Sequence, residues 1–578
     1  MKRLRGIVAK YLPVSVIVLV FLWSIVAIAL YRAAQAPPGA IVLRIGHWQL
    51  EASVREMFEE MADAYREINP NVHIVQDAIP EMVYAQWATT QLMGGTAPDI
   101  LQVGGMIPYH LLVQYYNRYM VPLTPYVNDP NPYNEGTSLE GVPLRSTFKD
   151  GMRSSYVEEM QEYISIPLSQ FGVRIFYNRD LLKQLTGLDE APTEYRAFLE
   201  ACREIEQHRN DKNQPYVAIA SSRYHLPMWE NMLMDPLTYG IKRVADFNRD
   251  GFVSNDELYV AFKTGRITFD HPSIRLRFQM LWEISKHFQT GYTGLTRDEA
   301  VFLFAQQRAV FMTTGTWDAR SLQEQADGKF NVGVMDFPRP LPDDPVYGEV
   351  MEGPQYERVL GGFPFSIVRT SKHPEVALDF LMFLAGKEQN EKLNRIIGWI
   401  PSVVDTELDP LLKAFEPHLR GVYGNFNIFL GGETWIKWLQ MYSQFQIHQI
   451  SYEDMRAEFE PFYIKHGLKD LEEQQKDWRR GMVNNEQFLA GIRARAMHAE
   501  GAEAQSFWIK YRSLTASRQI WPEISRARQM KLVEIGPDLG AVGPYEYSPE
   551  VLDRIRARLT EDDTDSTVGR VPDPASSQ

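Results

Sequence analysis

The sequence has very little cysteine and no excess of basic residues. Cys202 is its one cysteine among 578 residues, so an intramolecular disulfide and a paired-thiol metal site are excluded. The net charge is -14, which argues against nucleic acid and anionic membrane surfaces as partners, because both attract basic patches. The chain also lacks an HExxH motif, a GxSxG nucleophile elbow and a phosphate-binding loop. These absences argue against the common hydrolase and nucleotide-binding classes.

The N-terminal segment, residues 1–36, indicates export. Four basic residues precede an apolar run from Leu12 to Leu30, so the positive-inside rule places the N-terminus in the cytoplasm and the rest outside. The run has about 19 residues, enough to span a bilayer. We therefore predict a transmembrane anchor at the periplasmic face of the inner membrane. Ala34-Gln35-Ala36 resembles a cleavage site, so a cleaved signal segment is the alternative.

The exported part begins with an α/β pattern. A strand-like run at 41–48 precedes a helical repeat that ends at Asn69-Pro70, with Ser53 and Glu56 as a predicted capping box, and 72–75 reads as the next strand. Another strand-like run, 309–312, is followed by Trp317. In α/β sheets ligands bind beyond the carboxyl ends of the strands. Trp48 and Trp317 are therefore candidate ligand contacts.

Several short motifs are distributed along the chain. They are GGTAPDI at 94–100, IPL at 166–168, IFYNRDLL at 175–182, VFMTTGTW at 310–317 and SKHP at 371–374. With these motifs the chain resembles, over about 41–438, the family 1 extracellular solute-binding proteins of ABC importers. That group includes the maltodextrin- and other sugar-binding receptors.

The resemblance implies a two-lobed α/β fold of the type II periplasmic-binding-protein kind, with a hinge. The first lobe is expected at 41–165 and 335–390, and the second at 166–334 and 391–535. A helical C-terminal extension is expected to pack on the second lobe, with a partly disordered tail at 536–578. The implied function is to bind a solute, expected to be a sugar or oligosaccharide, and to deliver it to the importer's membrane subunits.

The expected ligand contacts combine rings with amides. Aromatic side chains can cover the apolar faces of sugar rings, while amides bind the hydroxyl groups. For Phe171, Tyr224 and Trp435 a role in the hydrophobic core is an equal alternative. The predicted contacts are Trp48, Gln49, Gln170, Phe171, Tyr224, Trp317 and Trp435.

A departure from the family pattern lies at 246–257. The segment has the spacing of a twelve-residue EF-hand calcium loop, in which oxygen atoms surround the cation and Gly251 allows a sharp turn. We predict one structural Ca²⁺ and no second loop; an ordinary acidic loop is the alternative. The predicted ligands are Asp246, Asn248, Asp250, the backbone carbonyl of Phe252, Ser254 through water, and Glu257.

Two other functions remain to be compared with a receptor. A surface-anchored glycosidase would release reducing sugar, but the adjacent carboxylates Glu158 and Glu159 suggest no shared catalytic geometry. A calcium-dependent scaffold would need a paired or repeated loop. We therefore predict that the protein is not an enzyme.

Overall fold

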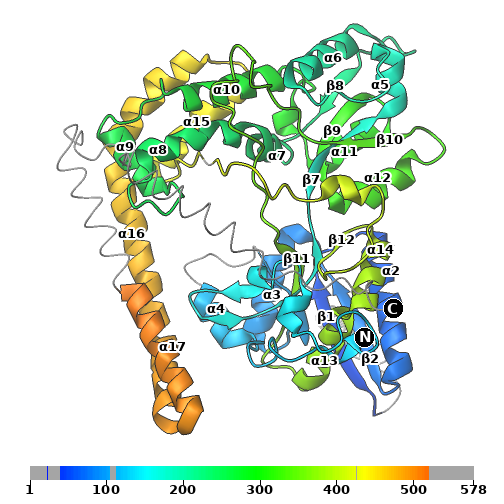
Figure 1. The fold of residues 1–578 in the computed structure, drawn as a ribbon, viewed down its shortest axis with the longest axis vertical. Coiled ribbons are helices and arrows are strands. Elements are labelled where there is room, and N and C mark those ends of the chain that lie inside the picture. Colours follow the sequence, from blue (N-terminus) through cyan, green and yellow to red (C-terminus); the bar gives the residue numbers. More distant parts are fainter. Residues whose placement is uncertain (1–22, 24–38, 105–111, 425, 520–578) are drawn as a thin grey trace, which may run out of the picture.

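The computed structural model describes residue 23 and residues 39–104, 112–424 and 426–519. Within these ranges the chain forms two lobes, each built around its own sheet (Figure 1), which confirms the predicted two-lobed α/β architecture. The predicted tail at 536–578 and, apart from Trp23, the predicted anchor lie outside the described residues. Inside them, no helix combines the length and apolar character needed to cross a membrane.

The first lobe contains a six-stranded sheet in the order β12-β6-β11-β3-β1-β2 and a separate short hairpin, β4-β5. β1 pairs in parallel with β2 and β3, whereas β11 runs antiparallel to β3 and β6. The strands are β1 (Ile41–His47), β2 (Val72–Ala78), β3 (Ile100–Gln102), β4 (Tyr156–Val157), β5 (Glu162–Tyr163), β6 (Ile166–Gln170), β11 (Gly361–Ile367) and β12 (Ile400–Pro401).

Helices cover both faces of this sheet. One face, with Leu43 and Ile45, packs against three helices, and the other, with Leu101, packs against two. Because both faces are buried, β11 in the sheet interior is almost wholly apolar, whereas β2 at the edge of the sheet carries His73, Gln76 and Asp77. The three helices are α2 (Ala52–Ile68), α13 (Pro374–Leu384) and α14 (Lys387–Ile397); the two are α3 (Glu81–Gly94) and α4 (Leu112–Tyr119).

The second lobe is built on a four-stranded sheet in the order β10-β7-β9-β8. β8 and β9 are parallel, and β7 is antiparallel to β9 and β10. Its strands are β7 (Val173–Asn178), β8 (Val217–Ala220), β9 (Ala309–Gly315) and β10 (Val332–Met335). Its helices are α5 (Arg179–Thr186), α6 (Tyr195–Gln207), α7 (Leu226–Trp229), α8 (Lys242–Ala245), α9 (Asn255–Lys263), α10 (Pro272–Ser285), α11 (Arg297–Ala305) and α12 (Ala319–Ala326).

The chain crosses between the lobes directly from β6 to β7. Gly172 lies at this crossing, where an added Cβ would come within 2.8 Å of the Phe415 carbonyl oxygen. The sequence predicted the boundary between the lobes at 165/166. It lies later in the chain, after β6, because β6 hydrogen-bonds with β11 in the first sheet. β12 and the part of α14 from residue 391, which the sequence assigned to the second lobe, also belong with the first.

One buried arginine holds the connecting segments together. The Arg174 guanidinium is fully buried and lies 2.9 Å from Asp336 and 3.1 Å from Glu357, which flank the connection between β10 and β11. It also donates to the carbonyl oxygens of Ala414 and Glu416, each at 2.7 Å, in the connection that follows β12. The three segments that connect the two sheets therefore meet at this side chain.

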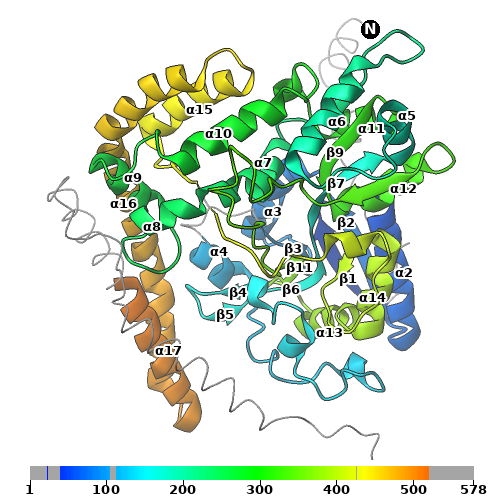
Figure 2. The same ribbon diagram turned by 45° about the horizontal axis from the view of Figure 1, so that its top comes forward.

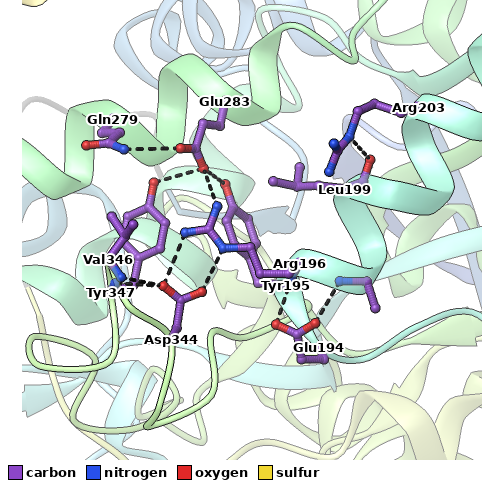
Figure 3. A network of polar contacts seen from close by, with 11 residues as sticks. Glu194, Tyr195, Arg196, Leu199, Arg203, Gln279, Glu283, Asp344, Val346 and Tyr347 are labelled. Atoms are coloured by element: carbon purple, nitrogen blue, oxygen red, sulfur yellow. Dashed lines mark hydrogen bonds and ion pairs between the residues drawn. The ribbon is translucent and has the colours of Figure 1, made fainter.

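A second polar network fastens the segment after β10 to the second lobe (Figure 3). Arg196 of α6 pairs with Asp344 at 2.7 Å, and its guanidinium lies 5.1 Å from the centre of the Tyr347 ring. Tyr195 and Tyr347 both donate to Glu283 of α10, at 3.0 and 2.9 Å. Residues 337–350, placed by the sequence in the first lobe, therefore pack on the second.

In the part of the C-terminal extension that the structure describes, up to residue 519, there are three helices: α15 (Gly432–Gln446), α16 (Tyr452–His498) and α17 (Gly501–Gln519). α15 and the beginning of α16 pack on the second lobe, as predicted. The end of α16 and α17 instead contact the first lobe. α16 follows one flank of the molecule in both views (Figures 1 and 2).

We predict that Arg174→Met destabilises the protein by about 3–5 kcal/mol, because Asp336 and Glu357 lose the buried cation that compensates their charges. Arg66→Met is the control, since the Arg66 side chain is 46% exposed and its ion pair with Asp63 is solvent-accessible, and it should cost about 0–1 kcal/mol. Urea unfolding of both variants provides the measurement. Equal small losses would show that Arg174 does not hold the connections.

Candidate functional site

A cleft of about 750 Å³ lies between the lobes, and both lobes contribute to its lining. From the first lobe, Trp48 follows β1 and Gln102 ends β3. From the second, Trp317 follows β9. The cleft is therefore at the carboxyl ends of the strands, where the sequence predicted a ligand site.

Aromatic rings form one wall of the cleft. The Phe171 ring lies 5.7 Å from Trp317 and 5.0 Å from Trp399, edge to face in both cases. Two glycines allow this arrangement: a Cβ on Gly315 would come within 2.3 Å of the Trp317 ring, and one on Gly362 within 2.5 Å of the Phe171 ring. Because these glycines have no side chain, the Trp317 and Phe171 rings can pack directly against the backbone.

Charged groups lie beside the rings in the second lobe. Arg297 forms an ion pair with Asp318, and Thr314 donates a hydrogen bond to the same carboxylate. The Arg297 guanidinium also lies 5.8 Å from the centre of the Tyr224 ring. Burial raises the pKa of Tyr224 to about 12, so its hydroxyl stays protonated and can donate to a ligand.

The first lobe supplies a carboxylate, Glu51, that forms no ion pair among the described residues. It is the N-cap of α2 but makes no side-chain cap hydrogen bond, and it lines the cleft. The predicted capping box of Ser53 and Glu56 is wrong, because α2 begins at Ala52 and Ser53 is already inside the helix. Burial raises the pKa of Glu51. A ligand that donates hydrogen bonds to Glu51 would compensate for this burial.

The structure brings five of the seven predicted ligand contacts together, because Trp48, Gln49, Phe171, Tyr224 and Trp317 all line the cleft. The other two are placed elsewhere. Gln170 is a buried residue of β6, paired with both neighbouring strands. Trp435 lies on α15, 4.8 Å from Phe429, and packs against the second-lobe core.

Several lining residues were missed by the sequence. Trp399 lies in the GWIP segment, whose motif gave no indication of a pocket, and Phe302 is a 60% exposed residue of α11. The capping box of Thr296 and Glu299 is a local signal that could have placed Phe302 on a helix, but not in a cleft. The missed residues also include Glu51, Glu81, Gln102, Arg297, Asp298 and Asp318, whose neighbours in the cleft come from distant parts of the chain.

The predicted calcium loop is closed by hydrogen bonds of its own. Glu257 accepts from the backbone N–H groups of Phe247 and Asn248 at 3.1 Å and from that of Ser254 at 3.0 Å. Asp246 accepts from Gly251, which has a φ of 81°, and its other carboxylate oxygen is buried without a partner. Throughout the described residues, no three His, Cys, Asp or Glu side chains are grouped so that they could hold a metal ion.

Two lobes joined by crossing segments, with an aromatic cleft between them, define a two-lobed solute receptor. The chain belongs to the family described as bacterial extracellular solute-binding protein, whose sequence profile matches residues 51–391. This confirms the family predicted from the motifs.

Individual relatives are distant. A multiple sugar-binding protein of Streptococcus mutans is 20% identical over 292 residues, which are 50% of this chain and 60% of that protein. An uncharacterized ABC transporter extracellular-binding protein of Pyrococcus horikoshii is 21% identical over 419 residues, 69% of this chain and 82% of the relative. The chain thus spans less than two thirds of the streptococcal protein.

Solved structures share the fold. RafE in complex with raffinose is 15% identical, with a TM-score of 0.51, and the match covers 73% of this chain and 99% of that one. The GacH receptor of Streptomyces glaucescens is 14% identical, with the same TM-score, and the match covers 75% and 99%. At these identities the comparison establishes the two-lobed architecture.

Buried histidines next to the cleft aromatics should make stability depend on pH. Burial lowers the pKa of His47 and of His225 to about 4 each. The unfolded chain then binds protons more readily than the folded protein below pH 6.5. The stability that the two neutral, buried histidines allow is therefore complete above pH 6.5. As the pH falls from 6.5 to 4, the free energy of unfolding decreases by about 1.4 kcal/mol per pH unit for each histidine.

We predict that His47→Gln with His225→Gln makes the free energy of unfolding less dependent on pH between 6.5 and 4. Urea unfolding at several pH values measures this slope. The exposed His208→Gln is the control and should retain the wild-type slope. An unchanged slope in the double variant would contradict the assignment.

Proposed function

We propose that this protein is an extracytoplasmic receptor that binds a sugar or oligosaccharide between its lobes and presents it to the membrane subunits of an ABC importer. The observation that carries the proposal is the aromatic wall of Phe171, Trp317 and Trp399, which lies beside hydrogen-bonding groups from both lobes. Rings that cover apolar sugar faces and polar groups that bind hydroxyls match this chemistry.

The charges in the cleft favour a neutral sugar over an anionic one. Among the described residues, its lining contains one basic residue, Arg297, whose charge is already paired with Asp318. Glu51, Glu81 and Asp298 also line the cleft. A carboxylated or phosphorylated sugar would therefore meet repulsion, whereas hydroxyl groups can donate to these carboxylates.

A receptor is favoured over the two alternatives. The relatives and solved structures compared above are binding proteins, which favours binding without turnover over a glycosidase. A scaffold function has no comparable support from the cleft. We also propose that residues 1–36 anchor the receptor at the outer face of the cytoplasmic membrane, on the basis of the basic residues and apolar run.

We predict that neutral oligosaccharides raise the melting temperature, whereas uronate-containing oligosaccharides, amino acids and polyamines do not. Trp317→Ala should weaken binding of the stabilising sugar at least tenfold, since a stacking contact and its buried area are lost. Isothermal titration calorimetry measures the affinity.

Trp435→Ala is the matched control, because this tryptophan lies outside the cleft, and it should bind the sugar like the wild type. Stabilisation only by a charged compound that is not a sugar would contradict the carbohydrate assignment. Release of reducing sugar would contradict the receptor and support the glycosidase.

We further propose that loop 246–257 binds one structural Ca²⁺. The twelve-residue spacing, the left-handed Gly251 and the unpartnered oxygen of Asp246 support this. Glu257 would exchange its hydrogen bonds to the loop backbone for the cation. The cation would then stiffen the connection between α8 and α9.

We predict that Ca²⁺ binds with measurable heat and raises the melting temperature. Asp246→Asn and Glu257→Gln should each lower the affinity for Ca²⁺ at least tenfold and reduce the rise in melting temperature. Calorimetry and thermal unfolding, with Mg²⁺ for comparison, provide the measurement. Asp211→Asn, at an exposed loop position, is the control. No binding heat and no thermal shift with Ca²⁺ would refute the site.

A further inference from the structure

α16 is docked on both lobes. Near its beginning, Met455, Phe459 and Tyr463 are fully buried in the core of the second lobe. The Phe459 ring lies 5.8 Å from Phe269 and 5.0 Å from Trp438. This part of α16 is therefore a fixed element of the second lobe.

The other end of the extension belongs to the core of the first lobe. Phe488, Leu489 and Ile492 of α16 are buried in a cluster with residues of α3 and α4, and Leu514 of α17, 1% exposed, joins the same cluster. Undocking this end would expose apolar surface on both partners.

Polar contacts fix the docked position of α17 beside the hairpin β4-β5. Lys510 forms an ion pair with Glu162 of β5, and both side chains are only 16% exposed. Gln161 donates a hydrogen bond to Ser513 at 2.7 Å. These polar contacts therefore define one docked position for α17, in addition to the stabilisation from apolar burial.

α16 is a single helix of 47 residues, about 70 Å long. It stands on the flank of the molecule away from β7, where the chain crosses between the lobes (Figures 1 and 2). Any change in the separation of the lobes on this flank must bend this helix or undock one of its ends.

We propose that α16 and α17 form a strut that fixes the separation of the two lobes, and that the α17 end must leave the first lobe before the cleft can close fully. This inference rests on the proposed function, in which the lobes close around a solute. The strut lies beyond the part of the chain that the family profile matches, 51–391. It therefore adds a constraint to the hinge.

The test measures the distance between the lobes without any ligand, so it does not depend on identifying the solute. Cys202 is buried, which allows selective spin labelling of introduced cysteines. Gln86→Cys on α3 and Glu204→Cys on α6 place one label on each lobe of the full-length protein. Double electron–electron resonance then gives the distribution of distances between them.

We expect one narrow distance with the strut docked. Leu514→Asp should broaden the distribution and add a population at shorter distance, because a buried apolar contact is replaced by a charge. Ile509→Asp is the matched control on the same helix, since Ile509 is 62% exposed, and it should leave the distribution unchanged. Identical distributions for the two variants would overturn the strut.

A charge exchange guards against simple misfolding of α17. Lys510→Glu alone should broaden the distribution, and adding Glu162→Lys should restore it, because the ion pair is rebuilt with its charges reversed. Failure of the double variant to restore the narrow distance would show that this contact does not set the separation. The solute receptor would stand even if the strut failed.

Discussion

The arrangement of the two lobes depends on the buried guanidinium of Arg174. Each connection between the sheets is a separate stretch of chain, and a loose connection would let the cleft walls shift independently. Arg174 contacts Asp336 and Glu357 on one connection and the carbonyl oxygens of Ala414 and Glu416 on another, while its own backbone lies in β7. Because its planar donors satisfy these groups in fixed directions, the connections form one unit at the hinge.

The arrangement of the cleft residues depends on these joined connections. Phe171 lies at the β6–β7 crossing, so the same backbone that joins the lobes also carries an aromatic side chain into the site. Trp317 and Trp399 reach it from β9 and from the segment before β12, and Gly315 and Gly362 leave room for their approach. A movement at the hinge is therefore transmitted directly to groups that line the cleft.

The C-terminal extension changes what this hinge can do. A two-lobed receptor with short connections moves at the hinge alone, whereas here a long helix joins the lobes on another flank through buried contacts. Binding must then compensate for the cost of undocking, which lowers the apparent affinity of the solute. The extension thus offers a physical means of setting affinity without any change in the cleft.

The sequence by itself determined the α/β class, the family and the strand-end tryptophans Trp48 and Trp317. These are local properties, since apolar runs, helix periodicity and turn residues each depend on neighbours along the chain. Only the tertiary structure decided that Trp399 and Glu51 share the cleft, that Trp435 and Gln170 do not line it, and that α17 docks on the first lobe. Those outcomes depend on which distant surfaces meet across the hinge, and a pattern confined to one segment carries no information about that meeting.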